Sequence, residues 1–245
     1  MLEGLYAAAS GMSAQQQQLD AVSNNIANQS TDGYHSEQVA FSDLLYSEVD
    51  EAGTDTRTGA GAAAIDIGSD EAAGSLQQTG KPLDLAIDGP GYFQVKQPGG
   101  QTLLTRDGAF SADANGRLVT AEGAYVQPPI TLPAGVSAQQ VSIASNGEVK
   151  AAGRTLGRIA IVEVPAPNGL LAAGGGQFGV TTASGAPRPA KGSTMIQGSL
   201  EGSNVNVAGE MTTMISDERS YQMSSSAVQI EGQMMSIANQ LVSSS

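Results

Sequence analysis

Few residues of this 245-residue chain could carry out acid-base or nucleophilic chemistry, and they do not cluster. His35 is the single histidine and the chain has no cysteine, so a disulfide framework and a thiolate zinc site are excluded. A Ser-His-Asp triad or a histidine metal site would depend on His35 alone, which follows Tyr34 in a polar turn. We therefore interpret His35 as an exposed histidine of a loop.

Two glycine-rich segments resemble phosphate-binding loops only in part. Residues 174–179 match the G-x-G-x-x-G pattern, but no helix-forming segment follows them, and the surrounding pattern is not that of a βαβ unit. In residues 74–81, five residues separate the two glycines, and Pro82 stands where a phosphate loop needs serine or threonine. We interpret the first segment as a flexible loop, and we exclude the second as a phosphate site.

Carboxylates are the remaining candidates for chemistry. A pair such as Asp84 with Asp88 could serve acid-base hydrolysis. Acidic residues that alternate with apolar ones are, however, what a half-exposed strand requires. We expect no catalytic, cofactor-binding or metal-binding residues and predict that the chain is not an enzyme. The alternative is a periplasmic or cytoplasmic hydrolase or binding protein with a helical hairpin and a β-domain, which would need a pocket with converging titratable groups.

The C-terminal residues 203–245 are predicted to form one long helix. Apolar residues recur there at alternating steps of four and three, which is the heptad spacing of a coiled-coil seam: Met223, Ala227, Ile230, Met234, Ile237 and Leu241. An apolar face continues upstream in a shifted register through Val207, Met211, Met214, Ile215 and Tyr221. About 36 helical residues from Asn206 would measure roughly 54 Å, which is longer than a compact domain of this size needs.

The N-terminal residues show the same spacing over about three heptads. The positions are Leu5, Ala8, Met12, Gln15, Leu19, Val22 and Ile26. This helix should end near Asn28, before the turn at Asp32-Gly33. The two terminal helices can pair, but we expect such a pair to leave Val228, Met235 and Val242 uncovered unless further copies of the chain cover them. An ordinary intramolecular helical hairpin packed on a β-domain remains an equal alternative.

The centre of the chain changes from helical to strand periodicity. We predict a short helix in residues 39–49 and a flexible or extended connector in residues 52–64. From about residue 76 the pattern has a period of two, with turn pairs such as Asn115-Gly116. The predicted strands are residues 83–88, 92–96, 102–106, 117–120, 130–132, 141–144 and 158–164.

These elements predict an α+β fold. Long N- and C-terminal helices form a coiled-coil-like terminal domain, and a central, mostly antiparallel β-domain lies between them in the sequence. The expected division is an N-terminal helix and turn (residues 1–34), a connector with a short helix and an extended segment (35–75), the β-domain (76–199) and the C-terminal helix (200–245).

Charge and terminal sequence exclude several function classes. The formal net charge is −13, and acidic residues dominate residues 37–71, where Arg57 is the only basic residue, so nucleic acid is not an expected partner. The first residues lack a basic segment, and the apolar run at residues 5–9 is too short for a signal peptide or a membrane span. By itself this predicts a cytoplasmic protein, unless export uses no cleaved signal.

Three groups of residues resemble the bacterial flagellar rod and hook protein family. Near the N-terminus, residues 21–28 (AVSNNIAN) and 31–34 (TDGY) are similar to its signature of paired asparagines and a Thr-x-Gly-aromatic turn. In the centre, the segments similar to its β-domain are residues 83–93 (LDLAIDGPGYF), 105–108 (TRDG) and 118–120 (LVT). Near the C-terminus, the segments similar to its closing helix are residues 200–207 (LEGSNVNV), 214–215 (MI) and 219–221 (RSY).

The resemblance implies a structural function. Subunits of this family stack helically into a hollow drive shaft that crosses the periplasm and transmits motor torque to the hook. Within the family, the pattern is most similar to distal rod proteins, with proximal rod proteins next. The implied partners are further copies of the chain, neighbouring rod proteins, the hook protein, the surrounding bushing rings and the flagellar type III export apparatus, which exports subunits without a cleaved signal peptide. The implied location is the basal body, with no cofactor and no membrane insertion.

The assembly interface is expected on the terminal helices and the turns beside them. The expected residues are Leu5, Met12, Leu19, Val22, Asn24, Asn25, Ile26, Asn28, Val205, Val207, Met211, Ile215, Tyr221, Met223, Ile230, Met234, Ile237 and Leu241. An asparagine amide can both donate and accept hydrogen bonds at a helix end. We therefore expect Asn28 and one of Asn24 or Asn25 to bond to backbone across or beside a subunit contact.

Overall fold

The computed structural model describes residues 2–43, 47–49, 56–58 and 61–243. The chain forms two compact units. Unit 1 comprises Met1–Ala27, Glu37–Ile67 and Asn206–Ser245, and unit 2 comprises Asn28–Ser36 and Gly68–Val205. The chain is therefore α+β, as predicted from the sequence, and both of its terminal segments belong to the same unit.

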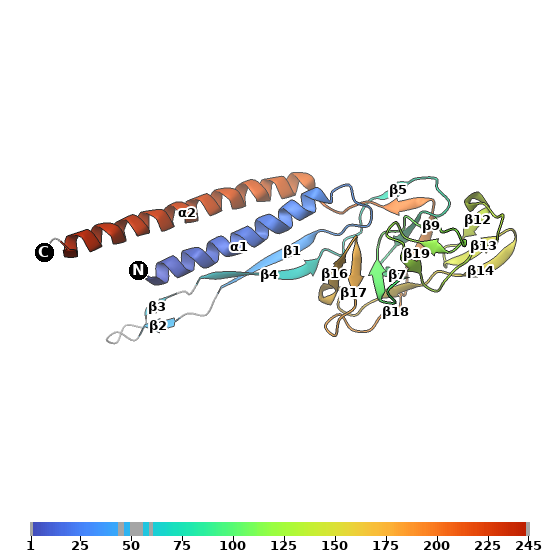
Figure 1. Cartoon of the computed structure of the whole chain (residues 1–245), viewed down its shortest axis with the longest axis horizontal. Helices are drawn as coiled ribbons and strands as arrows, with labels where there is room; N and C mark the ends of the chain where they lie inside the picture. The colour runs from blue at the N-terminus through green and yellow to red at the C-terminus, as the bar shows by residue number, and fades with distance from the viewer. Residues whose placement is uncertain (1, 44–46, 50–55, 59–60, 244–245) are drawn as a thin grey trace. The chain divides into compact units, whose positions relative to one another are not determined.

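Unit 1 consists of two long helices and two strand pairs (Figure 1). Helix α1 (Leu2–Ala27) and helix α2 (Val207–Ser243) run antiparallel and pack along one another. Strand β1 (Glu37–Asp43) packs on α1 and pairs with β4 (Ala62–Ser69). Strands β2 (Ser47–Val49) and β3 (Thr56–Thr58) form a second antiparallel pair. The two predicted helices are confirmed, and α1 ends within a residue of the predicted position.

The predicted short helix in residues 39–49 is wrong, because β1 and β2 occupy the described part of this segment. Residues 44–46 lie outside the description. Three apolar residues at helical spacing suggested a helix, but β1 finds its hydrogen-bonding partner in β4, about twenty residues later in the chain. Of the predicted connector, residues 52–55 and 59–60 lie outside the description, and Ala62 to Ala64 belong to β4.

Unit 2 is built from short strands in several small sheets. The largest sheet has the order β16-β17-β8-β7-β11-β10-β9, and β15 pairs with both β7 and β18. Its strands are β7 (Tyr92–Lys96), β8 (Thr102–Thr105), β9 (Ser111–Ala112), β10 (Leu118–Val119), β11 (Tyr125–Val126), β15 (Ile161–Glu163), β16 (Leu171–Gly174), β17 (Gln177–Gly179) and β18 (Arg188–Pro189). Neighbouring strands of this sheet pair antiparallel.

Smaller sheets complete unit 2. Strands β12 (Val141–Ile143), β13 (Glu148–Ala151) and β14 (Arg154–Arg158) form an antiparallel sheet. Strand β6 (Leu85–Asp88) pairs with β19 (Thr194–Gln197), and β5 (Leu76–Gln78) pairs with β20 (Ser199–Glu201). Short 3-10 turns lie at Ala138–Gln140 and Pro167–Gly169. The last strands before α2 therefore pair with the first strands of this unit.

Several of the predicted strands are confirmed, and two local interpretations need correction. Residues 92–96 coincide with β7. The predicted strand at residues 130–132 is not formed; an isolated β-bridge joins Thr131 to Arg117 instead. The glycine-rich segment interpreted as a flexible loop is a hairpin turn between β16 and β17, in which Gly174, Gly175 and Gly176 have φ values of 88°, 60° and 66°. Such positive φ values favour glycine.

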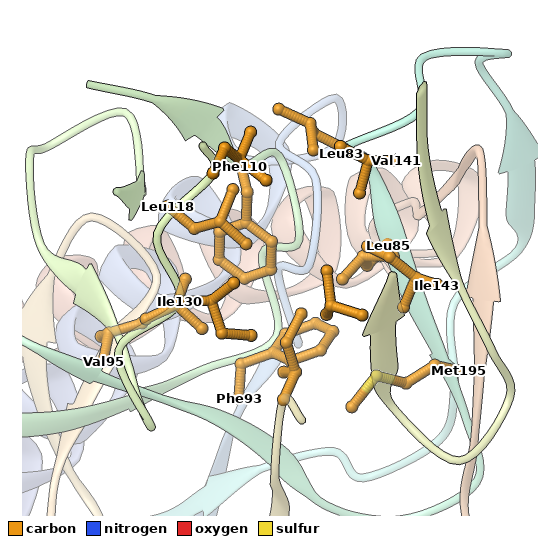
Figure 2. Close-up of a cluster of buried hydrophobic side chains, with 14 of the residues drawn as sticks. Leu83, Leu85, Phe93, Val95, Phe110, Leu118, Ile130, Val141, Ile143 and Met195 are labelled. Carbon is orange, nitrogen blue, oxygen red and sulfur yellow. The ribbon is translucent and has the colours of Figure 1, made fainter. Parts of the chain in front are cut away.

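The larger of two hydrophobic clusters in the described part of unit 2 is shown in Figure 2, and the smaller one contains Leu104, Val162 and Val164. The ring of Phe93 is fully buried and meets Phe110 edge to face at a centroid distance of 5.1 Å. Branched aliphatic side chains from β6, β12 and neighbouring segments, such as Leu85 and Ile143, surround the two rings. The alternating apolar positions of short strands thus converge on one interior, as the period of two predicted.

Replacing Phe93 with alanine should destabilise unit 2. The change removes a fully buried ring and its contact with Phe110, so we expect the free energy of unfolding to fall by about 3–5 kcal/mol. Urea unfolding of unit 2, followed by NMR signals of its amides, measures this change. The control is Leu171→Ala, because Leu171 is 66 % exposed and should cost less than about 1 kcal/mol. Equal effects of the two substitutions would contradict the assigned core.

Candidate functional site

The outer face of α2 carries a row of large apolar side chains in contact with water. Met223, Ile230, Met234 and Ile237 are each more than half exposed, and Met223 reaches 68 %. Met211 and Ile215 continue this exposure toward the start of α2. We call these six residues the α2 stripe. Soluble monomers rarely expose a contiguous apolar surface of this kind unless it serves binding. The predicted position Tyr221 is 36 % exposed and lies on the other side of the helix, with Met214 and Val228.

The face of α2 that packs along α1 is a different one. Met214, Val228 and Met235 are half-buried on it. The expectation that Val228 and Met235 would be left uncovered is therefore wrong, and the side chain of Val242 lies outside the description. The reason is that α2 carries two apolar faces, and the heptad spacing alone does not decide which one the intramolecular partner takes.

Helix α1 offers mainly small or polar side chains for burial. Among the described residues of unit 1, the buried apolar residues are Ala14, Ala21 and Val22. The other predicted positions on α1 that can be described, Met12, Leu19 and Ile26, are half-buried, and the side chains of Leu5 and Leu241 lie outside the description. The helix pair therefore buries little apolar area relative to its length.

Polar atoms are also enclosed where the helices meet. The side-chain oxygens Gln15 Oε1, Gln18 Oε1 and Asp217 Oδ2 are buried without a hydrogen-bond partner. Gln18 and Asp217 lie at the same level of the antiparallel pair, since each is seven residues from the bonded pair Asn25 and Glu210. Burial raises the pKa of Asp217 above its ordinary value. Unsatisfied acceptors weaken the contact, because their desolvation is not offset.

Asn25 fixes the C-terminal end of α1 within unit 1. Its side chain is 2 % exposed, and its Oδ1 accepts a hydrogen bond from the Glu37 backbone N–H at 2.8 Å. Its Nδ2 donates to the Glu37 carbonyl oxygen at 3.0 Å and to Glu210 Oε1 at 3.2 Å. One amide therefore pairs with both backbone groups of a residue in β1 and also holds the first turn of α2. These bonds lie within one chain, so they do not test the predicted role at a subunit contact.

The other predicted positions at the helix ends are spread over both units. Asn24 is exposed and lines a groove of about 470 Å³ between α1 and the β1–β4 pair. Asn28 is half-buried in unit 2, where its Oδ1 accepts a hydrogen bond from Thr31 Oγ1 at 3.1 Å. Val205 and Val207 are half-buried. The asparagines of the N-terminal motif therefore have three different local environments.

A buried ionic cluster lies inside unit 2 at Glu201, the last residue of β20. Glu201 is 1 % exposed, and its Oε2 accepts a hydrogen bond from Arg106 Nη1 at 3.1 Å. Its Oε1 lies 3.2 Å from His35 Nε2 and accepts a bond from the Gly74 backbone N–H at 3.0 Å. We call Glu201, Arg106 and His35 the Glu201 cluster. A carboxylate removed from water is stable only with such partners.

His35 is buried, so the interpretation of an exposed loop histidine is wrong. It is 5 % exposed, and its Nδ1 lies 2.7 Å from the Asp70 carbonyl oxygen. Its partners are 35 and 166 residues away in the sequence, and no local pattern connects them. The available signal was that both partners lie in motifs noted above: Arg106 in TRDG and Glu201 in LEGSNVNV.

Two effects of opposite sign act on the pKa of Glu201. Burial raises it, but the hydrogen bond from His35, the charge of Arg106 and the Gly74 amide together outweigh burial, so the pKa lies below its ordinary value. Glu201 is consequently ionised at neutral pH.

Backbone bonds join the same segments. Gly33 has a φ of 67°, and a Cβ there would lie 2.5 Å from the Asp107 nitrogen, so glycine is required. Its N–H donates to the Glu201 carbonyl oxygen at 2.7 Å. The Asn204 side chain accepts from the Ser36 N–H at 2.8 Å and donates to the Asp70 carbonyl at 3.0 Å and the Ala72 carbonyl at 2.8 Å.

The described residues do not form a catalytic or metal-binding arrangement. Asp84 is buried and accepts a hydrogen bond from Thr79 Oγ1 at 2.6 Å, whereas Asp88 is exposed, so the suggested carboxylate pair does not act on a common site. Within the same residues, no group of three acidic or histidine side chains is placed to hold a metal ion. The helices of the described chain are also not apolar enough over a sufficient length to cross a membrane.

Comparison with known proteins covers nearly the whole chain. The family described as flagella basal body rod protein matches residues 5–35, the flagellar hook protein FlgE/F/G D1 domain matches residues 86–151, and the flagellar basal body rod FlgEFG protein C-terminal family matches residues 196–241. The flagellar basal-body rod protein FlgG of Caulobacter vibrioides is 35 % identical, over 98 % of this chain and 99 % of its own length. The chain belongs to the flagellar basal-body rod protein family.

Two further relatives are from Bacillus subtilis. Its flagellar basal-body rod protein FlgG is 36 % identical over 93 % of this chain and 94 % of its own length. Its flagellar hook-basal body complex protein FlhP is 32 % identical over 98 % and 99 %. The resemblance noted from the motifs is confirmed, and so is the expected function of a structural rod subunit. The hydrolase alternative finds no support.

Replacing Asn25 with alanine should loosen unit 1 of this rod-family protein. The change removes three hydrogen bonds and leaves the Glu37 backbone groups without those partners, so we expect a loss of about 1–3 kcal/mol. Helix melting, measured by circular dichroism at 222 nm, reports the change. The control is Ser23→Ala on the same helix, because Ser23 is exposed and should stay within about 0.5 kcal/mol of the parent. A parent-like Asn25→Ala protein would show that the amide bonds do not stabilise the unit.

Replacing Glu201 with glutamine should destabilise unit 2 in a pH-dependent way. At pH 7 we expect a loss of about 3–5 kcal/mol, because Arg106 loses its buried counter-ion. Since the folded-state pKa of Glu201 is lowered, its contribution is present above the unfolded-state pKa and disappears as the pH falls through the folded-state pKa.

Urea unfolding at pH 7 and at pH 3 measures this difference. The stability gap between parent and variant should narrow at pH 3. Glu148→Gln is the control, because Glu148 is partly exposed and its Lys150 partner lies at the surface. A gap that stays constant with pH would mean that the carboxylate charge is not responsible for the loss.

Proposed function

We propose that this chain builds the flagellar rod by packing the α2 stripe against further copies of itself. Support comes from the imbalance within unit 1. Its described residues bury three apolar side chains, whereas the α2 stripe leaves six large ones exposed. Burial of a large apolar side chain contributes roughly 1.5–3 kcal/mol, so the unit can gain more stability from neighbours than from its own fold. This imbalance is the observation that carries the proposal.

The spacing of the stripe fits a helical partner. From Met223 to Ile237 the exposed residues follow the heptad pattern, which places them along one side of a helix. A second helix with the same spacing, from a neighbouring copy, would complete a coiled-coil-like terminal domain. Arg219 is the only basic residue of α2 and lies within the shifted part of the pattern, so polar pairing there would help to set the register between copies.

The proposed assembly is a hollow helical rod that crosses the periplasm and transmits motor torque to the hook. The chain would form its distal part, with neighbouring rod proteins and the hook protein at its ends and bushing rings around it. We further propose export through the flagellar type III apparatus, in line with the chain's membership of the rod protein family. In this proposal Asn24, Asn25 and Asn28 fix the end of α1 close to a neighbouring subunit.

Replacing Met234 with aspartate should block assembly and leave the isolated chain folded. Met234 is 54 % exposed in the isolated chain, so the change should barely alter its stability. A subunit contact would bury an unpaired carboxylate at a cost of several kcal/mol, which corresponds to at least a hundredfold rise in the concentration needed for assembly.

Electron microscopy and sedimentation of the purified chain measure filament formation, and a motility assay tests the variant in cells. The matched control is Gln229→Asp, which introduces the same charge at an exposed position of α2 away from the stripe. The control should still assemble. Filaments or swimming with Met234→Asp would show that the stripe is not a subunit contact.

A further inference from the structure

The hydrogen-bonding geometry of His35 specifies its charge. Nδ1 lies 2.7 Å from the Asp70 carbonyl oxygen, which can only accept, and Nε2 lies 3.2 Å from Glu201 Oε1. A neutral imidazole has one N–H and one lone pair, so it can satisfy only one of two acceptors. Both contacts are favourable only when both ring nitrogens carry a proton or when Glu201 is itself protonated.

The surroundings of Glu201 exclude the second possibility. Its two oxygens already accept hydrogen bonds from the Arg106 guanidinium and the Gly74 N–H, which favour the ionised carboxylate. The proton therefore resides on His35, and the ring is an imidazolium that bridges Glu201 and the backbone of Asp70.

Charged and titratable groups approach this ring from several segments. Those on or beside the packed segments are Asp32 and Tyr34 in its own turn, Asp70 and Glu71 after β4, Tyr92 on β7, Arg106 and Asp107 after β8, and Glu201 on β20. Among them, Glu201 is the acidic side chain within hydrogen-bond distance of the ring, and its negative charge favours the imidazolium.

The His35 ring lies where three segments of the chain meet, so its protonation affects how they are held together. His35 lies two residues before Glu37, where the chain leaves unit 2. Asp70 lies two residues after Gly68, where the chain enters unit 2 again. Glu201 lies a few residues before Val205, the last residue of unit 2. We call these three segments, residues 33–36, 70–74 and 201–204, the junction. The imidazolium is one side chain that bonds two of its segments while being part of the third.

We propose that protonation of His35 closes the junction and that the junction loosens as the pH rises and the ring loses its proton. In the neutral ring, one nitrogen lone pair faces an oxygen lone pair, so one of the two bridges is lost. The closed form binds one proton more than the loosened form and is therefore favoured at lower pH. The Asn204 side chain, which has no titratable group, continues to hold Ser36 and Asp70, so the change is a loosening and not a loss of fold.

The single histidine makes a direct test possible on the full chain. NMR of the protein labelled with nitrogen-15 histidine gives signals from one ring. At pH 6 both ring nitrogens should be protonated, and at pH 8.5 one should not. Hydrogen exchange over the same range should show protection factors at Gly33 and Gly74, whose N–H groups donate to Glu201, that fall about tenfold or more with rising pH. The amides of β7 and β8, two strands that pair with each other, serve as the internal control, and their protection factors should stay constant over this pH range.

Two variants separate protonation from a purely structural role. His35→Gln has no titratable ring, so the junction amides should be weakly protected at both pH values. Glu201→Gln replaces the carboxylate with an uncharged amide that can accept from the protonated ring or donate to the neutral one, so the pH response of the junction should disappear. Should a variant fail to fold, the pH series of the parent protein decides alone. A neutral ring at pH 6, or junction amides equally protected at pH 6 and pH 8.5, would overturn the proposal.

Discussion

The requirement that the buried Glu201 carboxylate be fully paired determines the path of the chain through one end of unit 2. With 1 % exposure, the carboxylate cannot use water and instead takes a guanidinium, an imidazole and a backbone N–H from three separate segments. Apolar packing could bring these segments together in several registers, since it has no directional preference. An ionic cluster allows only one arrangement, because any shift leaves a buried charge unpaired.

The apolar residues of α2 lie on two faces, one half-buried and one exposed. Helix α1, which packs along α2, buries small side chains such as Ala14 and Ala21, and Asp217 Oδ2 of α2 is enclosed without a hydrogen-bond partner. The opposite stripe carries large side chains such as Met223 and Ile230 in water. Close packing of small residues brings two helix backbones together but contributes little burial energy, so the intramolecular contact sets the alignment of α2 and leaves most of its apolar surface for neighbours.

Periodicity in the sequence predicted those parts of the fold whose determinants are local. The steps of three and four predicted α1 and α2 nearly to their ends, and the period of two predicted strands such as β7. It failed where the partner is distant. Strand β1 depends on β4 and on the Asn25 amide, and neither contact leaves a trace in the spacing of apolar residues. For the same reason His35 was assigned to an exposed loop, although Glu201 lies 166 residues away and buries it.

The site was likewise predictable only where a single segment defines it. The apolar positions on α2 could be identified from spacing, but which face would meet α1 depends on the side chains of the other helix. The asparagines illustrate the same limit. Asn24, Asn25 and Asn28 are close in sequence and chemically identical, but Asn25 bonds to Glu37 at the start of β1, whereas Asn28 accepts a bond from Thr31. The identity of a residue fixes what bonds it can form, and the tertiary fold decides which of them exist.

The Glu201 cluster lies in the long segment that connects α1 and α2, and this position affects how easily the two helices can pair. The helices are separated by residues 28–206, and pairing them across an unfolded connection of that length would carry a large entropic cost. Unit 2 removes this cost by holding the two ends of the connection together: Gly33 donates to the Glu201 carbonyl at 2.7 Å, and Asn204 donates to the Tyr34 carbonyl at 3.3 Å. The weak helix contact of unit 1 can then form as a local event. The bonds that bring the ends together must be stronger than the contact that they support, and a fully paired, buried carboxylate with its surrounding backbone bonds meets that condition.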